Sequence, residues 1–117
     1  MGSKSDAEKE DSKSVIEQAL LFINDGEISL AESTLTDAML LEDNTYDVYS
    51  KYDSICYKII KYHLDRNDLS AAESFALEYR SALKNDDKWE DSSCYKLLKE
   101  KFKEADMSFK NLKVGWF

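Results

Sequence analysis

The chain has 117 residues, no proline, three glycines and a formal net charge of −8. This length suits one domain with a core of its own, and the scarcity of the two helix-breaking residues favours an all-α fold. The acidic balance argues against nucleic-acid binding, which needs cationic side chains against phosphate, and the absence of any run of about 18 apolar residues argues against a membrane span. A basic protein partner suits such a charge.

The first stretch, residues 1–12, is polar and lacks the apolar core of a secretory signal. We expect it to be a flexible lead before a single helical domain over residues 13–113. Cys56 and Cys94 are the only cysteines; they lie among apolar residues and have no CxxC spacing. They are therefore predicted to be reduced core residues of a cytoplasmic protein.

Apolar residues recur with the helical spacing i, i+3, i+4, i+7 in five segments. These segments are 15–23, 28–38, 46–64, 69–83 and 98–112. Short stretches such as NDGE and KNDDK separate them, and such residues favour turns and helix caps. The predicted fold is all-α with about five helices, of which the last caps the C-terminal end of the domain before an apolar tail over 114–117, with Trp116 and Phe117 at its end.

Two serines near predicted helix starts, Ser29 and Ser70, are each followed three residues later by a glutamate. This is the spacing of a capping box, in which the serine and the glutamate bond each other's backbone amides. The sequence therefore predicts a capping box at the start of the second and of the fourth helix.

The stretch NDGEISLAES fits half of a calcium-binding loop, because Gly26 and Glu32 fall at the positions of its glycine and its last ligand. The first two ligand positions are Leu21 and Ile23, which have no side-chain oxygen, so no calcium site is predicted. His63 lies on an apolar helical stripe and is expected in the core. Since no nucleophile–base pair, metal motif or phosphate loop occurs, the protein is predicted to be non-enzymatic and without cofactor or metal.

The sequence repeats itself at an offset of 41 residues, which pairs Gly26 with Asn67 and Ala31 with Ala72. Applied once more, the same offset carries the first helix through the third predicted helix to the last. Such self-similarity is typical of stacked antiparallel helical hairpins.

The first unit resembles a tetratricopeptide repeat. Ala19, Ala31 and Ala38 match the small-residue positions of that family, Gly26 its turn glycine and Phe22 its bulky first-helix position. The resemblance covers about residues 14–84 and implies hairpins whose first helices line a groove for a partner. The second unit departs from the pattern and neither unit ends in proline, so a helical bundle without repeats is the alternative.

By this resemblance, we expect an adaptor or small chaperone that holds a helical or extended segment of another protein. Tyrosines crowd the third predicted helix, and tyrosine is favoured at protein interfaces, although a buried central helix would also explain them. The residues predicted to bind the partner are Phe22, Tyr49, Lys51, Tyr52 and Tyr62.

A second hypothesis comes from charge, because residues 14–50 contain no lysine or arginine. It describes an acidic inhibitor, such as an immunity protein or antitoxin, that blocks a basic partner. The acidic face would consist of Glu27, Glu32, Asp37 and Glu42. Binding through these carboxylates would depend steeply on salt, whereas binding through the groove tyrosines would not.

Overall fold

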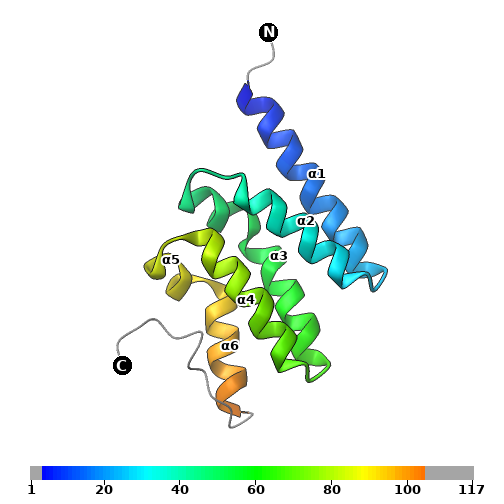
Figure 1. Ribbon diagram of the computed structural model, residues 1–117, viewed down its shortest axis with the longest axis vertical. Helices are drawn as coiled ribbons and strands as arrows, with labels where there is room; N and C mark the ends of the chain where they lie inside the picture. The colour runs from blue at the N-terminus through cyan, green and yellow to red at the C-terminus, as the bar shows by residue number, and fades with distance from the viewer. Residues whose placement is uncertain (1–3, 105–117) are drawn as a thin grey trace.

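The structure is a computed structural model that describes the backbone of residues 4–104 and the side chains of residues 14–102. Within that range the chain is all-α, which confirms the predicted fold class, and it has six helices. They are α1 (Lys4–Asn24), α2 (Ile28–Leu40), α3 (Thr45–Asp65), α4 (Leu69–Leu83), α5 (Asp86–Asp91) and α6 (Ser93–Glu104), as labelled in Figure 1.

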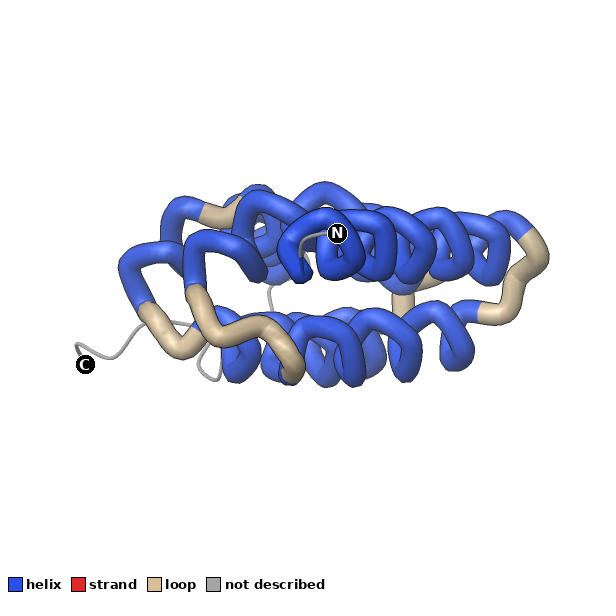
Figure 2. The backbone as a smooth tube through the Cα atoms, turned by 90° about the horizontal axis from the view of Figure 1, so that it is seen from above, coloured by secondary structure: helices blue, strands red, loops and turns tan. Residues whose placement is uncertain are grey.

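The helices form two layers when the molecule is seen from above (Figure 2). Each of the first two helix pairs packs together, α1 against α2 and α3 against α4. The pairs then meet through contacts of α3 with α1 and of α4 with α2, and α6 packs on α3. This places α2 and α4 beside each other, an arrangement that matters for the site described below (Figure 1).

Helix α3 is the centre of the domain, because it contacts every other helix in the described range. Eight of its residues are buried, which accounts for the unusually wide apolar face in its sequence. Ala31 on α2 and Ala72 on α4 are fully buried as well. Side chains this small let neighbouring helices approach closely, and a larger one would overpack the contact.

The turns that join α1 to α2 and α3 to α4 make the same backbone hydrogen bonds. The amides of Glu27 in the first turn and Asp68 in the second each bond the carbonyl five residues earlier, at 2.8 Å and 2.9 Å. Gly26 and Asn67 precede these donors and have φ angles of 79° and 57°, the left-handed region that glycine and asparagine tolerate best. The two turns that the 41-residue offset pairs thus have the same backbone hydrogen bond and the same left-handed residue before its donor.

The two predicted capping boxes are wrong. Ser29 and Ser70 are the second residues of α2 and α4, so neither can be an N-cap. Asp68 is the N-cap of α4, and its carboxylate accepts a 3.1 Å hydrogen bond from the amide of Ala71. At α2 the N-cap position is Glu27, whose side chain makes no capping bond. The acid just before each helix occupies the place that the sequence pattern gave to the serine.

Helix α1 begins at Lys4, inside the segment 1–12 that the sequence predicts to be a polar lead. This first part of α1 has no apolar stripe, which is the signal that the helix prediction relies on. Its alanine, lysine and glutamate residues nevertheless have high intrinsic helix propensity, and that preference does not depend on an apolar face.

The sequence does not predict α5, because its residues belong to a stretch rich in Asn and Asp. Asn85 caps this helix by accepting a hydrogen bond from the amide of Lys88 at 2.9 Å, and Trp89 is fully buried. A six-residue helix is too short to show an apolar period. Helix α6 starts before the predicted position 98, at Ser93, and its predicted end at 112 and the 114–117 tail lie outside the described residues.

Candidate protein-binding groove

Tyr52, one of the predicted partner-binding residues, is a core residue. Its side chain is 1% exposed and belongs to the main cluster of buried apolar residues. Helix α3 contacts every other described helix, which accounts for this burial. The position of Tyr52 agrees with the buried central helix that the sequence leaves open as the alternative, and partner binding by this residue stays a prediction.

The other predicted aromatic residues are half-buried and make contacts within the chain. The Lys88 ammonium lies 5.2 Å from the ring centroid of Tyr49, within the range of a cation–π contact. The guanidinium of Arg66 lies 3.5 Å from the ring centroid of Tyr62. Phe22 packs against the core from α1. These contacts leave part of each ring exposed, but they do not gather the rings into one groove.

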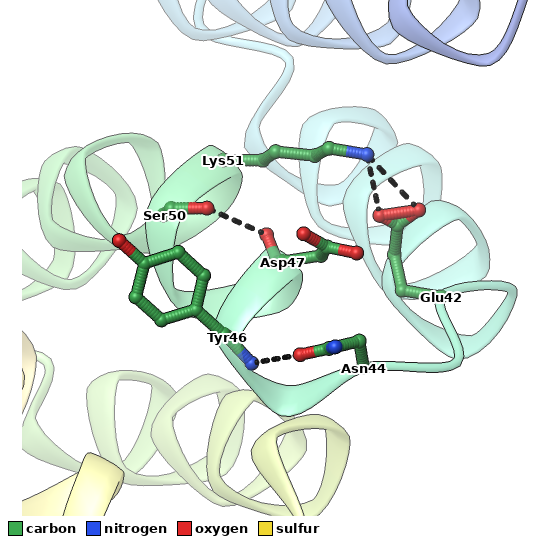
Figure 3. A network of polar contacts seen from close by, with 6 residues as sticks. All are labelled: Glu42, Asn44, Tyr46, Asp47, Ser50 and Lys51. Atoms are coloured by element: carbon green, nitrogen blue, oxygen red, sulfur yellow. Dashed lines mark hydrogen bonds and ion pairs between the residues drawn. The ribbon is translucent and has the colours of Figure 1, made fainter. Parts of the chain in front are cut away.

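Lys51 and Glu42 bond each other, although the sequence assigns them to different candidate sites. The Lys51 ammonium reaches back from α3 to the Glu42 carboxylate at 2.9 Å (Figure 3). Its hydrogen bond to Glu42 raises the pKa of Lys51 above the ordinary value of 10.5. Close by, the Asn44 side chain accepts a 2.7 Å hydrogen bond from the amide of Tyr46 and caps α3 (Figure 3). The Lys51–Glu42 ion pair and the Asn44 cap both stabilise the turn between α2 and α3.

Two residues of the predicted acidic face, Glu32 and Asp37, lie in a groove between α2 and α4. The groove has a volume of about 640 Å³. Its lining consists of Ser29, Glu32, Ser33, Thr36 and Asp37 from α2 and Ala71, Ser74, Phe75 and Glu78 from α4. Both sets follow helical spacing, so the groove lies between two facing helix stripes. Most of the lining side chains are short, which leaves the space between the helices open.

Three carboxylates face this groove, from Glu32, Asp37 and Glu78, and none of its nine described lining residues is lysine or arginine. Such an arrangement gives the groove a negative potential that attracts cations. The carboxylate of Glu32 is held in place by a contact with α3, because it lies 2.8 Å from Nε2 of the buried His63. Asp37 and Glu78 are exposed.

Sequence reasoning missed the α4 half of the groove, although the repeat contains a signal for it. The 41-residue offset pairs Ser33 with Ser74 and Asp37 with Glu78. Residues at equivalent positions of α2 and α4 therefore line opposite sides of the groove. Glu27, the remaining acid of the predicted face, is exposed at the start of α2 but does not line the groove. None of the five residues predicted to bind the partner, Phe22, Tyr49, Lys51, Tyr52 and Tyr62, lines this groove.

A second, smaller cavity of about 430 Å³ lies at the end of α4. It is lined by Leu77, Arg80, Ser81, Lys84, Asn85 and Asp86. Arg80 lies 3.4 Å from the Asp86 carboxylate, so charges of both signs meet at this cavity. It has no consistent potential that would select one class of ligand.

A second set of polar groups, apart from the groove, connects three helices. The Asp53 carboxylate accepts hydrogen bonds from the hydroxyls of Tyr79 and Ser93, both at 2.7 Å, and thereby joins α3, α4 and α6. Cys56 and Cys94 are free thiols in the core, as predicted. Burial raises the pKa of both thiols well above 9.0, which keeps them protonated and weakly nucleophilic at neutral pH.

In the part of the chain that the structure describes, no three His, Cys, Asp or Glu side chains are grouped as ligands of a metal ion. None of the described helices is long and apolar enough to cross a membrane. Comparison of the chain with known protein families, with curated proteins and with solved structures finds no match in any of the three. The groove is therefore interpreted from its own geometry.

Proposed function

We propose that this protein is a non-enzymatic binding module that holds a basic segment of another protein in the groove between α2 and α4. The observation that carries the proposal is the set of three carboxylates, from Glu32, Asp37 and Glu78, along a groove whose lining has no lysine or arginine. The short hydroxyl side chains between them can accept or donate further hydrogen bonds to a bound backbone.

The groove favours a protein over a nucleic acid, because its carboxylates would repel phosphate. Of the two hypotheses drawn from the sequence, this groove supports binding through the acidic residues of α2 rather than through the tyrosines of α3. Tyr52 is buried, and Lys51 forms an ion pair with Glu42. Whether the bound partner is blocked, as by an inhibitor, or carried, as by an adaptor or chaperone, depends on what the basic segment does in that partner.

The fold we propose is a stack of tetratricopeptide-like hairpins, supported by the equivalent turns at Gly26 and Asn67. In the family that the sequence resembles, the partner is expected against the first helix of each unit. The groove here lies between the second helices of the two units, α2 and α4. We place the protein in the cytoplasm, where free core thiols such as Cys56 and Cys94 persist.

The test is the binding of a fluorescently labelled peptide of alternating lysine and alanine, followed by anisotropy. The double variant Asp37→Asn, Glu78→Gln should bind about 2- to 30-fold more weakly, because each exposed ion pair is worth about 0.2–1 kcal/mol. The matched control Glu17→Gln, Glu100→Gln removes two exposed charges from α1 and α6 and should bind like the wild type. The difference should shrink in about 0.5 M salt.

Equal weakening by both double variants would mean that the peptide responds only to net charge, and the groove would then be abandoned as the site. No measurable binding of the lysine peptide to the wild type at low salt would also overturn the proposal. Both variants should keep the helical circular dichroism and unfolding midpoint of the wild type, because Asp37, Glu78, Glu17 and Glu100 are all exposed.

A further inference from the structure

We infer that His63 regulates the groove through Glu32: when the imidazole of His63 takes up a second proton, it neutralises the Glu32 carboxylate, and the groove holds a basic segment less tightly. This inference rests on the function proposed above and adds a dependence on pH to the same site. It comes from the contact between the two side chains, from the place of His63 at the end of α3, and from the histidine content of the sequence.

The contact between Glu32 and His63 assigns the hydrogen of the neutral imidazole. Nε2 of His63 lies 2.8 Å from Oε2 of Glu32, and an ionised carboxylate can only accept hydrogen bonds. Nε2 must therefore carry a hydrogen, and Nδ1 is the nitrogen that takes up the second proton. While the ring is neutral, Glu32 keeps its full negative charge. Once the ring is protonated, the same contact is an ion pair whose two charges cancel.

This pair of side chains connects the core to the groove. His63 is buried, with 7% of its surface exposed, whereas the side chain of Glu32 is 26% exposed and lines the groove. A partner in the groove can reach the carboxylate but not the histidine behind it. A change of charge on His63 therefore alters the potential of the groove without a direct contact between the histidine and the partner.

The surroundings of His63 allow a charged ring although it is buried. His63 lies in the last turn of α3, where the helix dipole favours a positive charge. Among the side chains of residues 14–102, no ion pair joins the ring to α1, α4 or α6, so Glu32 from α2 is its charged partner. On α3 itself, the Tyr62 ring meets the imidazole edge-on at 5.7 Å, and the Arg66 guanidinium lies over Tyr62.

The acids of the turn that follows α3 have partners of their own. The Asp65 carboxylate pairs with Lys61 at 3.1 Å. The Asp68 carboxylate accepts a hydrogen bond from the amide of Ala71 and caps α4. Glu32 is therefore the carboxylate that responds to the charge of His63.

The pH range in which the groove should respond follows from residue types. Histidine is the side chain that ordinarily changes its charge between about pH 5 and 8, and His63 is the only histidine among the 117 residues. The thiols of Cys56 and Cys94 stay protonated in this range, because burial raises the pKa of both well above 9.0. By linkage, a bound cationic segment must in turn oppose the protonation of His63.

The first experiment repeats the anisotropy titration of the lysine–alanine peptide on the full-length protein at about pH 7.5 and about pH 5.5. The peptide is acetylated at its N-terminus, so it has no group that titrates between these values. The wild type should bind it about two- to fivefold more weakly at the lower pH, which is the effect of losing one exposed ion pair. The variant Glu17→Gln, Glu100→Gln should show the same ratio, because both side chains are exposed and lie outside the groove.

Two variants test whether the ratio comes from the His63–Glu32 pair. His63→Gln keeps an N–H donor for Glu32 but cannot change its charge, so it should bind the peptide equally at both pH values. Glu32→Gln removes the carboxylate, and burial then disfavours the charged ring. This variant should lose most of the pH dependence as well.

The second experiment uses the wild type alone, because a single histidine gives a single imidazole signal in NMR spectra. The signal is followed from about pH 5 to pH 8 with and without saturating peptide. The midpoint of its titration should move to lower pH by about 0.3–0.7 units when the peptide is present, which is the same factor of two to five seen from the other ligand. A histidine with a purely structural role would titrate identically in both samples.

The outcomes separate this inference from the proposed function. Equal binding to the wild type at both pH values, a pH dependence that survives in His63→Gln, or a midpoint that the peptide does not move would each overturn the regulation by His63. The function would stand in these cases if Asp37→Asn, Glu78→Gln still weakened binding. No binding of the peptide at either pH would sink the proposed function and its regulation together. If circular dichroism shows that His63→Gln is unfolded, the imidazole signal of the wild type decides.

Discussion

At the scale of single residues, Asp53 connects three helices through its side chain. Its carboxylate accepts hydrogen bonds from the hydroxyls of Tyr79 and Ser93, and Oδ2 also accepts a hydrogen bond from the amide of Ser93 at 3.3 Å. One side chain thus holds α4 and the start of α6 to the central helix. Because Tyr79 is fully buried, its hydroxyl would lose its bond to the protein without regaining one to water.

The variant Asp53→Ala should therefore lower the free energy of unfolding by about 2–4 kcal/mol, measured by urea denaturation. Hydrogen bonds to a charged group contribute about 1.5–3 kcal/mol, and the donors left unpaired add to the loss. The control is Asp65→Ala on the same helix, whose carboxylate is exposed and pairs with Lys61 at 3.1 Å. That change should cost less than about 1 kcal/mol. Equal losses in the two variants would show that the Asp53 bonds add nothing to stability.

At the scale of helices, the sequence predicts the long amphipathic elements well and the short ones poorly. Helix α4 spans the predicted residues 69–83, and α3 differs from its predicted bounds by one residue at each end. Both have long apolar stripes. Helix α5 has only Trp89 to bury, and a single apolar residue has no period. Its position depends on tertiary contacts with α4 and α6 that no local pattern contains.

The groove, too, could be predicted only in part, because local sequence patterns do not show which helices pack together. The acids of α2 are visible in the sequence as a stretch without lysine or arginine, and two of the four residues of the predicted acidic face, Glu32 and Asp37, line the groove. Their partner Glu78 lies on another helix, in a segment that also contains Arg80, so local charge does not single it out. Only the packing of α2 beside α4 brings the three carboxylates to one groove.

The contact between helices leads to a prediction at Ala31, which is fully buried where α2 packs. Substitution by leucine should overpack this contact and lower the free energy of unfolding by about 1–3 kcal/mol, as measured by denaturant titration. Ser33→Leu, at an exposed position of the same helix, should change stability by less than about 0.5 kcal/mol. If the Ala31→Leu variant were as stable as the wild type, α2 would not pack as closely on its neighbouring helices as described.

At the scale of the whole molecule, the domain should unfold as one unit, because every other described helix contacts α3. The buried titratable groups of all helices then contribute to a single transition. Cys56, Cys94 and Tyr79 are the groups with strongly raised pKa values: burial is the largest cause in each, and the Tyr79 pKa is raised further by its hydrogen bond to Asp53.

These shifts predict a loss of stability in alkali. A raised pKa in the folded state means that the unfolded chain releases its proton first, so stability is complete below the unfolded pKa and falls as the pH rises above it. The ordinary pKa is 9.0 for the two thiols and 10.0 for Tyr79. The free energy of unfolding should therefore fall from about pH 9 upward, by about 1.4 kcal/mol per pH unit for each thiol.

The measurement is a series of urea titrations between about pH 8 and pH 11 on the wild type and on the variant Cys56→Ala, Cys94→Ala. Removing the thiols costs some core packing at every pH, so the slope against pH is compared rather than the absolute stability. The net negative charge also grows in alkali as lysines lose their protons, but the resulting repulsion acts on both proteins alike and cancels in the comparison. The variant should lose clearly less stability between pH 9 and 10 than the wild type. Parallel curves would mean that the thiols ionise as easily in the folded protein as in the unfolded chain, and that water reaches the core around α3.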